Sequence, residues 1–373
     1  MQGRKILLSV LLVLFTTFTA FSQTEALKMV VNNLAFYKQK KDLKFLGNAK
    51  KTVDSLVKAS ADSLDLERNV YKAVVYSAIL YTDTLNKLNQ PESFFSQTSE
   101  LVDNLSSRKK IYKFDVDMEY AKNCLADVCI RKAFVYENNS DFVNALDFFE
   151  RAKKYAPSFQ KINAYIAYSN NKLGNLQAAA KYYTDLIGGD NTKAEYVEAA
   201  SNIYKSFGDT VTALEVVKKG RKVLPNNKSL LLDEANIYNN KKDYLSLVKL
   251  LPALLDINTN NADISFVAAN CYDHLNQYDK AESLYLHAIE LNSSAYGPVF
   301  DLGLLYFKQS EMKRERGNDQ NTARAVQWLE KANEISPNDG NCLQVLKIVY
   351  AQTGNQDKIK SINNQLKQLT NQE

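Results

Sequence analysis

Residues 262–295, ADISFVAANCYDHLNQYDKAESLYLHAIELNSSA, hold one complete copy of the pattern that decides the fold. Ala269 and Tyr272 are three positions apart in the first half, and Ala281 and Tyr285 are four positions apart in the second. Residues at these spacings share one face of a helix. A polar, turn-forming stretch separates the halves. The segment therefore predicts two helices joined by a turn, each with one packing stripe.

The same four positions recur with a period of 34 residues over the C-terminal two-thirds of the chain. The first position is always small, at Ala133, Ala167, Ser201, Ala235, Ala269 and Gly303. The second is mostly tyrosine, at Tyr136, Asn170, Tyr204, Tyr238, Tyr272 and Tyr306. The third row is Ala145, Ala179, Ala213, Leu247 and Ala281, and the fourth is Phe149, Tyr183, Val217, Leu251 and Tyr285. Small residues let helices approach and large ones fill the space beside them, so the rows predict stacked helical hairpins.

This pattern resembles the tetratricopeptide repeat (TPR) family, whose 34-residue helix-turn-helix unit has the signature W-x2-L-G-x2-Y, A-x3-F and P. The best matches are Leu302-Gly303-x2-Tyr306 with Ala325-x3-Leu329 and Pro337, and Ala145-x3-Phe149 with Pro157. The first-position Trp is missing throughout, Asn170 replaces a Tyr, and Leu247 replaces an Ala. The resemblance implies an all-α fold, a right-handed superhelical TPR solenoid of antiparallel helix hairpins.

Seven units are predicted from residue 126 to the end of the chain. Their bounds are 126–159, 160–193, 194–227, 228–261, 262–295, 296–339 and 340–373. The sixth unit contains ten extra residues between its helices, within 308–322, so longer helices that project from the solenoid are expected there. The last unit ends in a polar helix that suits a solvated cap.

Residues 23–125 are also expected to be helical, although they do not follow the period. Helices are predicted at 25–38, 43–58, 64–85 and 92–105. We interpret this region as two degenerate TPR-like hairpins continuous with the array, and a separate helical domain is the alternative.

The first 22 residues have the layout of a secretory signal peptide. Arg4 and Lys5 precede an apolar stretch that is shorter than the roughly 20 residues of a membrane-spanning helix. Ala20 and Ser22 fit a cleavage site before Gln23. We expect cleavage after Ser22, no membrane span in the remaining chain, and a periplasmic or secreted bacterial protein; an uncleaved N-terminal anchor is the alternative.

Composition and charge narrow the class of partner. The formal net charge is +5, or about +3 without Arg4 and Lys5, which is too small to indicate a nucleic-acid partner. The four cysteines are expected to be unpaired: Cys124 and Cys129 lie on different faces of one predicted helix, and Cys271 and Cys342 fall two repeats apart.

The sequence contains none of the usual catalytic motifs. It has no G-x-S-x-G elbow, H-E-x-x-H, P-loop or strand-associated G-x-G-x-x-G. His274 and His287 are the only histidines, and no Cys or carboxylate recurs at ligand spacing, so no metal site and no cofactor are expected. Acidic residues before the second helices are interpreted as N-caps rather than catalytic groups; these are Asp141, Asp209, Asp243 and Asp279. We expect the chain not to be an enzyme.

An asparagine precedes three of the periodic tyrosines by two positions. These residues, Asn202, Asn236 and Asn270, are each 34 apart and are called the Asn row below. Side chains on the first helix of a unit line the inner groove in TPR structures, and the spacing resembles the asparagine ladders by which several TPR and armadillo proteins hold an extended peptide. Residues expected to shape neighbouring subsites are Tyr168, Asp273, His274, Phe300 and Phe307. The alternative is that these asparagines only end helices.

These observations predict a non-catalytic scaffold of the bacterial envelope that binds an extended protein or peptide segment in the concave TPR groove, in association with an envelope complex. The alternative is a structural subunit of an envelope or secretion assembly that acts through self-association or permanent docking.

Overall fold

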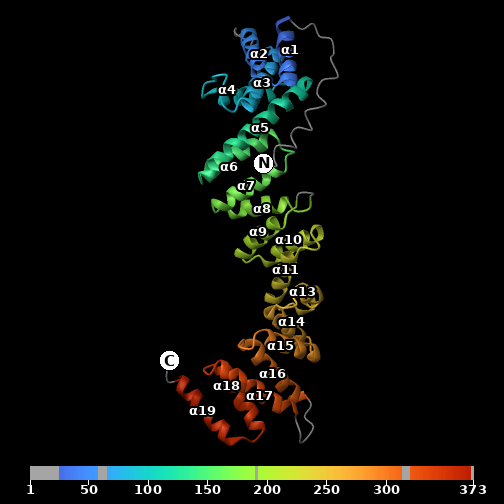
Figure 1. Ribbon diagram of the computed structural model, residues 1–373, viewed down its shortest axis with the longest axis vertical. Coiled ribbons are helices and arrows are strands. Elements are labelled where there is room, and N and C mark those ends of the chain that lie inside the picture. Colours follow the sequence, from blue (N-terminus) through green and yellow to red (C-terminus); the bar gives the residue numbers. More distant parts are fainter. Residues whose placement is uncertain (1–24, 58–64, 190–191, 313–319, 371–373) are drawn as a thin grey trace. The chain divides into compact units, whose positions relative to one another are not determined.

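The structure is a computed structural model that describes residues 25–57, 65–189, 192–312 and 320–370. Every regular element in these ranges is a helix, and within each unit described below most consecutive helices pack against one another (Figure 1). The chain divides into two compact units, an N-terminal unit of residues 1–191 and a C-terminal unit of residues 192–373. The predicted signal peptide, residues 1–22, lies outside the described residues.

The N-terminal unit consists of eight α-helices and a short 3-10 turn in its described part. They are α1 (Glu25–Lys40), α2 (Leu43–Leu56), α3 (Leu66–Thr82), α4 (Phe94–Ser106), η4 (Ile111–Phe114), α5 (Asp115–Asn138), α6 (Phe142–Tyr155), α7 (Lys161–Lys172) and α8 (Leu176–Asp185). The first four match the helices predicted before residue 106, with ends shifted by a few residues. The helix α5 begins at Asp115, so the predicted unit edge at 126 falls inside a helix.

The C-terminal unit continues as hairpins of a first and a second helix. Its helices are α9 (Ala194–Ser206), α10 (Thr210–Val223), α11 (Lys228–Asn240), α12 (Tyr244–Leu247), α13 (Leu251–Ile257), α14 (Ala262–His274), α15 (Tyr278–Leu291), α16 (Tyr296–Met312), α17 (Gln320–Ile335), α18 (Gly340–Gln352) and α19 (Gln356–Thr370). The long α16 and α17 confirm the expected lengthening beside the insert, whose residues 313–319 lie outside the described ranges.

The periodic rows form the core of the hairpins. The small first-row residues and all third- and fourth-row residues are buried. The chain then reverses through a residue with positive φ four positions after the tyrosine row, at Ser140, Gly174, Gly208, Lys242 and Asn276, and in the last hairpin at Gly354, four positions after Tyr350. The next residue donates its N–H to the carbonyl of the tyrosine-row residue, as Asp209 does to Tyr204 at 3.0 Å. The same left-handed turn therefore closes hairpin after hairpin.

Three of the four predicted N-caps are confirmed. The side chains of Asp141, Asp209 and Asp243 accept backbone N–H groups at the starts of α6, α10 and α12. The prediction for Asp279 is wrong, because α15 already begins at Tyr278 and Gln277 occupies the cap position.

The second helix of the fourth hairpin is broken. The helix α12 has four residues and α13 has seven, with a turn at 248–250 between them. Pro252 is the second residue of α13. Since proline has no N–H and its ring clashes with the preceding turn, one helix cannot run through this position. Both short helices pack against α11 and α14.

The described cysteines agree with the sequence prediction. Cys124, Cys129, Cys271 and Cys342 are free and buried. Among the described residues, no helix combines the length and the apolar character that crossing a bilayer requires.

Candidate functional site

The Asn row lies on the first helices of three successive hairpins. Asn202 is on α9, Asn236 on α11 and Asn270 on α14. Asn202 and Asn236 are exposed, and neither side chain makes a hydrogen bond to any residue that the structure describes. Each amide thus presents two donors and one acceptor to a ligand.

Polar contacts fix α9 beside α11 close to these two amides. Lys205 Nζ lies 2.6 Å from Asp233 Oδ1, and Ser201 Oγ donates to Asp233 Oδ2 at 2.9 Å. The hydroxyl of Ser229 on α11 donates to Glu198 on α9. Packed helices are separated by about 8–10 Å, a distance that about three residues of extended chain span.

Asn270 differs from the other two members of the row. It is half-buried, its Oδ1 accepts a hydrogen bond from the Tyr285 hydroxyl of α15, and its side chain also bonds Asp301 of α16. The row is therefore uniform in sequence but not in environment. Asn202 and Asn236 are free to bind, whereas Asn270 holds α14 against α15 and α16.

A pair of carboxylates lies next to Asn270. Asp273 accepts from Lys308 Nζ at 3.1 Å, which links α14 to α16. Burial, and the negative charge of Asp273, raise the pKa of Asp301 to about 6, and the hydrogen bond from Asn270 opposes this rise. Ionised Asp301 is thus a destabilised charge inside the C-terminal unit.

The other predicted site residues have packing partners of their own. The His274 ring is exposed but stacks on Tyr244 with centroids 4.2 Å apart. Phe300 stacks on Tyr296 at 5.3 Å, and Phe300 and Phe307 are half-buried against the core formed by α14 to α19.

Tyr168 lies on α7 of the N-terminal unit. Its ring is 39% exposed and meets Phe142 edge to face, with centroids 6.0 Å apart. Lys172 Nζ lies 5.3 Å from the ring centroid. Tyr168 occupies the register of the Asn row one period before Asn202.

Sequence reasoning missed Asp301, Lys308 and Tyr285 as neighbours of the Asn row. The sequence did contain one signal for Asp301. It lies two periods after Asp233, and both aspartates contact the preceding first helix, Asp233 through Ser201 and Asp301 through Asn270. The register of the Asn row also continues into the last two hairpins, where it is occupied by apolar residues, the half-buried Leu304 and, beyond the insert, the exposed Ile348.

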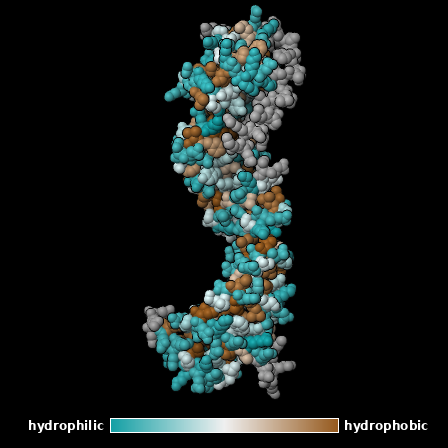
Figure 2. Space-filling model, in the orientation of Figure 1, coloured by the Kyte–Doolittle hydropathy of each residue, from teal (hydrophilic) through white to brown (hydrophobic). Residues whose placement is uncertain are grey.

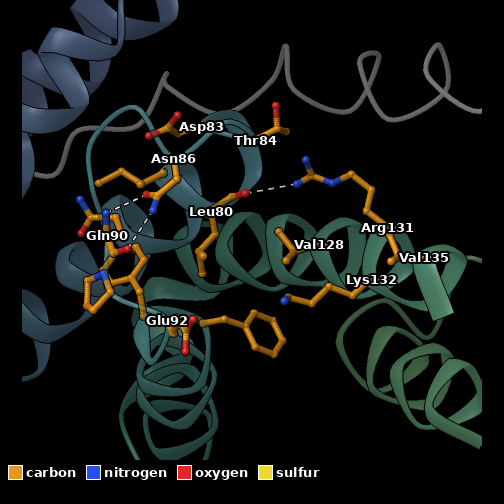
Figure 3. Close-up of a pocket in the computed structure, with 14 residues that line it drawn as sticks. Leu80, Asp83, Thr84, Asn86, Gln90, Glu92, Val128, Arg131, Lys132 and Val135 are labelled. Atoms are coloured by element: carbon orange, nitrogen blue, oxygen red, sulfur yellow. Dashed lines mark hydrogen bonds between the residues drawn. The ribbon is translucent and has the colours of Figure 1, made fainter.

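A cavity of about 460 Å³ lies within the N-terminal unit, between the end of α3, the 83–93 loop, the start of α4, and α5. Its apolar lining includes Leu80, Phe95, Val128 and Val135. Figure 3 shows the polar side chains around it, including Arg131 on α5 and Asn86 and Gln90 on the loop.

Most polar groups of this cavity hold the surrounding backbone. Arg131 donates to the carbonyl of Leu80 at 3.2 Å (Figure 3) and to that of Tyr81 at 3.0 Å, which satisfies the end of α3. Asn86 exchanges hydrogen bonds with the Gln90 backbone, and Asp83 accepts from two N–H groups of the loop. These bonds account for the shape of the loop and do not specify a ligand.

Two further observations bear on chemistry. In the described ranges, no group of three or more His, Cys, Asp or Glu residues is placed to hold a metal ion. In the view of Figure 2, hydrophilic residues cover most of the visible surface, with apolar residues scattered among them. This distribution agrees with the burial of the periodic rows.

The helical architecture and the sequence period together indicate a helical-repeat protein. It is all-α, it consists of antiparallel hairpins, and its rows repeat every 34 residues. The tetratricopeptide repeat family model matches residues 262–294, which form the hairpin α14–α15. Residues 262–294 thus match a tetratricopeptide repeat, and the described hairpins around them follow the same 34-residue period.

The chain is also similar to several solved structures, one of which is described as a TPR protein. The crystal structure of MamA is 20% identical, with a TM-score of 0.41, covering 46% of this chain and 95% of that one. YrrB, described as a TPR protein with an unusual peptide-binding site, is 18% identical, with a TM-score of 0.44, covering 53% and 97%. MamA 41-end from Desulfovibrio magneticus RS-1 is 16% identical, with a TM-score of 0.39, covering 48% and 97%.

Proposed function

We propose that this chain is a non-catalytic scaffold that holds an extended segment of a protein partner along the Asn row. The observation that carries the proposal is the pair of exposed amides, Asn202 and Asn236, on adjacent first helices at equal register. An extended backbone offers N–H and C=O groups at regular intervals, and a side-chain amide matches both. TPR arrays are protein-interaction modules, which agrees with this function.

Asn270 has a supporting part in this proposal. Its amide already bonds Tyr285 and Asp301, so its main role is to position α14 against α15 and α16, and it is less available for binding the partner segment. Exchanging Asn270 would disturb the fold together with binding. The decisive substitutions are therefore Asn202→Ala and Asn236→Ala.

Selection of 12-residue unstructured peptides on the purified chain, followed by affinity measurement, tests this function. The Asn202→Ala/Asn236→Ala variant is compared with Asn226→Ala/Asn260→Ala, two exposed asparagines that are also 34 residues apart but lie in turns between hairpins. Losing about 1 kcal/mol at each amide predicts roughly 30-fold weaker binding for the first variant only. Equal binding by both variants, or failure to select any peptide, would contradict the function.

We also propose that the chain acts outside the cytoplasm, in association with an envelope complex. This rests on the signal-peptide layout of residues 1–22. Mass spectrometry of the N-terminus of the cell-produced protein tests it, with Gln23 as the expected first residue.

A further inference from the structure

We propose that the segment held along the Asn row is basic, and that one of its lysine or arginine side chains binds beside Asp301. This inference rests on the proposed function and adds the chemical class of the occupant. It is supported by the excess of acidic side chains on the first helices of the C-terminal unit, by the ion pairs that these acids lack, and by the apolar side chains beside Asp301.

The charged side chains three, four or seven residues from the row position, on the same face of α9, α11, α14 and α16, are predominantly acidic. They are Glu195, Glu198, Lys205, Asp233, Asp263, Asp273, Asp301, Lys308 and Glu311. Seven are acids and two are bases, although the whole chain carries a net charge of +5. This face therefore has a charge opposite in sign to that of the protein as a whole.

Both bases on this face are already paired. Lys205 is bound by Asp233, and Lys308 by Asp273. Four of the remaining acids are not paired with a cation among the residues that the structure describes; these are Glu195, Glu198, Asp263 and Asp301. The face consequently lacks about four positive charges, which a basic segment would supply.

Helix electrostatics explain some of these acids but not Asp301. Glu195 and Asp263 are in the first turns of α9 and α14, where negative charge is stabilised by the helix dipole. Asp301 is the sixth residue of α16, beyond the first turn, half-buried next to Asp273. Its ionised form costs stability, a cost that a bound cation would offset.

The apolar surroundings of Asp301 suit a long basic side chain. Leu304 and Phe300 lie on the same helix, half-buried, within one turn of it. The methylene stem of lysine or arginine packs on apolar surface while its charged end reaches a polar partner. Asn202 and Asn236 would then hold the backbone of the occupant, and Asp301 would select its side chain.

Three labelled 12-residue peptides test this inference on the full chain by fluorescence anisotropy. They share a Gly, Ser and Asn framework and differ only in carrying Lys, Gln or Glu at positions 3, 6 and 9. Non-specific attraction to a chain of charge +5 would favour the Glu peptide. We expect the Lys peptide to bind at least about fivefold more tightly than the Gln peptide, and the Glu peptide to bind most weakly.

Substitutions locate the preference. Asp301→Asn, and separately Glu198→Gln, should reduce the advantage of the Lys peptide. Glu215→Gln/Glu290→Gln, which neutralises two exposed acids on the second helices α10 and α15, should leave it unchanged. Circular dichroism verifies that each variant is folded.

The outcomes separate this inference from the proposed function. Equal binding of all three peptides, weakened by Asn202→Ala/Asn236→Ala, overturns the basic occupant and leaves the scaffold function in place. A Lys preference that survives Asp301→Asn overturns the assignment to Asp301. No binding of any peptide, or binding insensitive to the asparagine substitutions, overturns the function and this inference together.

Discussion

Replacing Asp301 by asparagine should stabilise the protein at neutral pH. The pKa of this carboxyl is raised from 3.8 to about 6 in the folded state by burial and by Asp273. Because the pKa is raised, the folded state favours the protonated carboxyl over the ionised one. The stability that this preference contributes is fully present below pH 3.8 and is lost as pH rises through 6. The shift corresponds to about 3 kcal/mol at pH 8, and about half of that at pH 5. Asparagine keeps an acceptor for Asn270 and never ionises.

Urea unfolding followed by circular dichroism measures this effect, because the slope and midpoint give the free energy of unfolding at each pH. Asp301→Asn should raise that free energy by about 1.5 kcal/mol at pH 5 and about 3 kcal/mol at pH 8. The control is Asp256→Asn, an exposed acid on α13, for which a change below about 0.5 kcal/mol is expected. The reasoning is refuted if Asp301→Asn is neutral or destabilising at pH 8, or if its effect is the same at both pH values.

Three further predictions concern the hairpins themselves. Gly208→Ala should lower the free energy of unfolding by about 1 kcal/mol, because the φ of Gly208 is +76°, which alanine disfavours. No atom lies within 4 Å of the new methyl group, so steric overlap would not contribute. Gly340→Ala is the control, since its methyl group is equally unobstructed and its φ is not positive, and it should be neutral or stabilising. Gly303→Ala should cost about 1–3 kcal/mol in the same assay, because its Cβ would lie 2.8 Å from Leu329 Cγ; an unchanged midpoint would show that α17 yields freely. Mass spectrometry after alkylation should find no modified cysteine in the native protein at pH 8 and complete modification in urea, because burial raises every thiol pKa; the residues are Cys124, Cys129, Cys271 and Cys342.

The hairpin architecture was predictable because the residues that pack between helices recur at fixed intervals in the sequence. A buried residue such as Ala213 or Val217 repeats wherever helices of equal length approach at equal distance, so spacing alone reveals the stack. The broken second helix was less evident. Leu247 and Leu251 keep their rows and remain buried on either side of the break, so periodicity gave no sign of it.

The candidate site was predictable only in part, for a similar reason. The 34-residue spacing identified Asn202, Asn236 and Asn270 as equivalent positions. It did not reveal that Tyr285 and Asp301 engage Asn270, because those partners lie on other helices. His274 was assigned to a binding role from its place on the first helix of its unit, and its stacking partner Tyr244 lies on α12 of the preceding hairpin.

The break between α12 and α13 has a mechanical consequence. A stack of hairpins under tension carries force in series, so its weakest joint yields first. Helices of four and seven residues have little stability without their packing partners, yet they join α11 to α14. Stretching the C-terminal unit should therefore extend it first at residues 244–257. An occupant bound at Asn236 on one side of that joint and at Asp301 on the other would act as a splint across it.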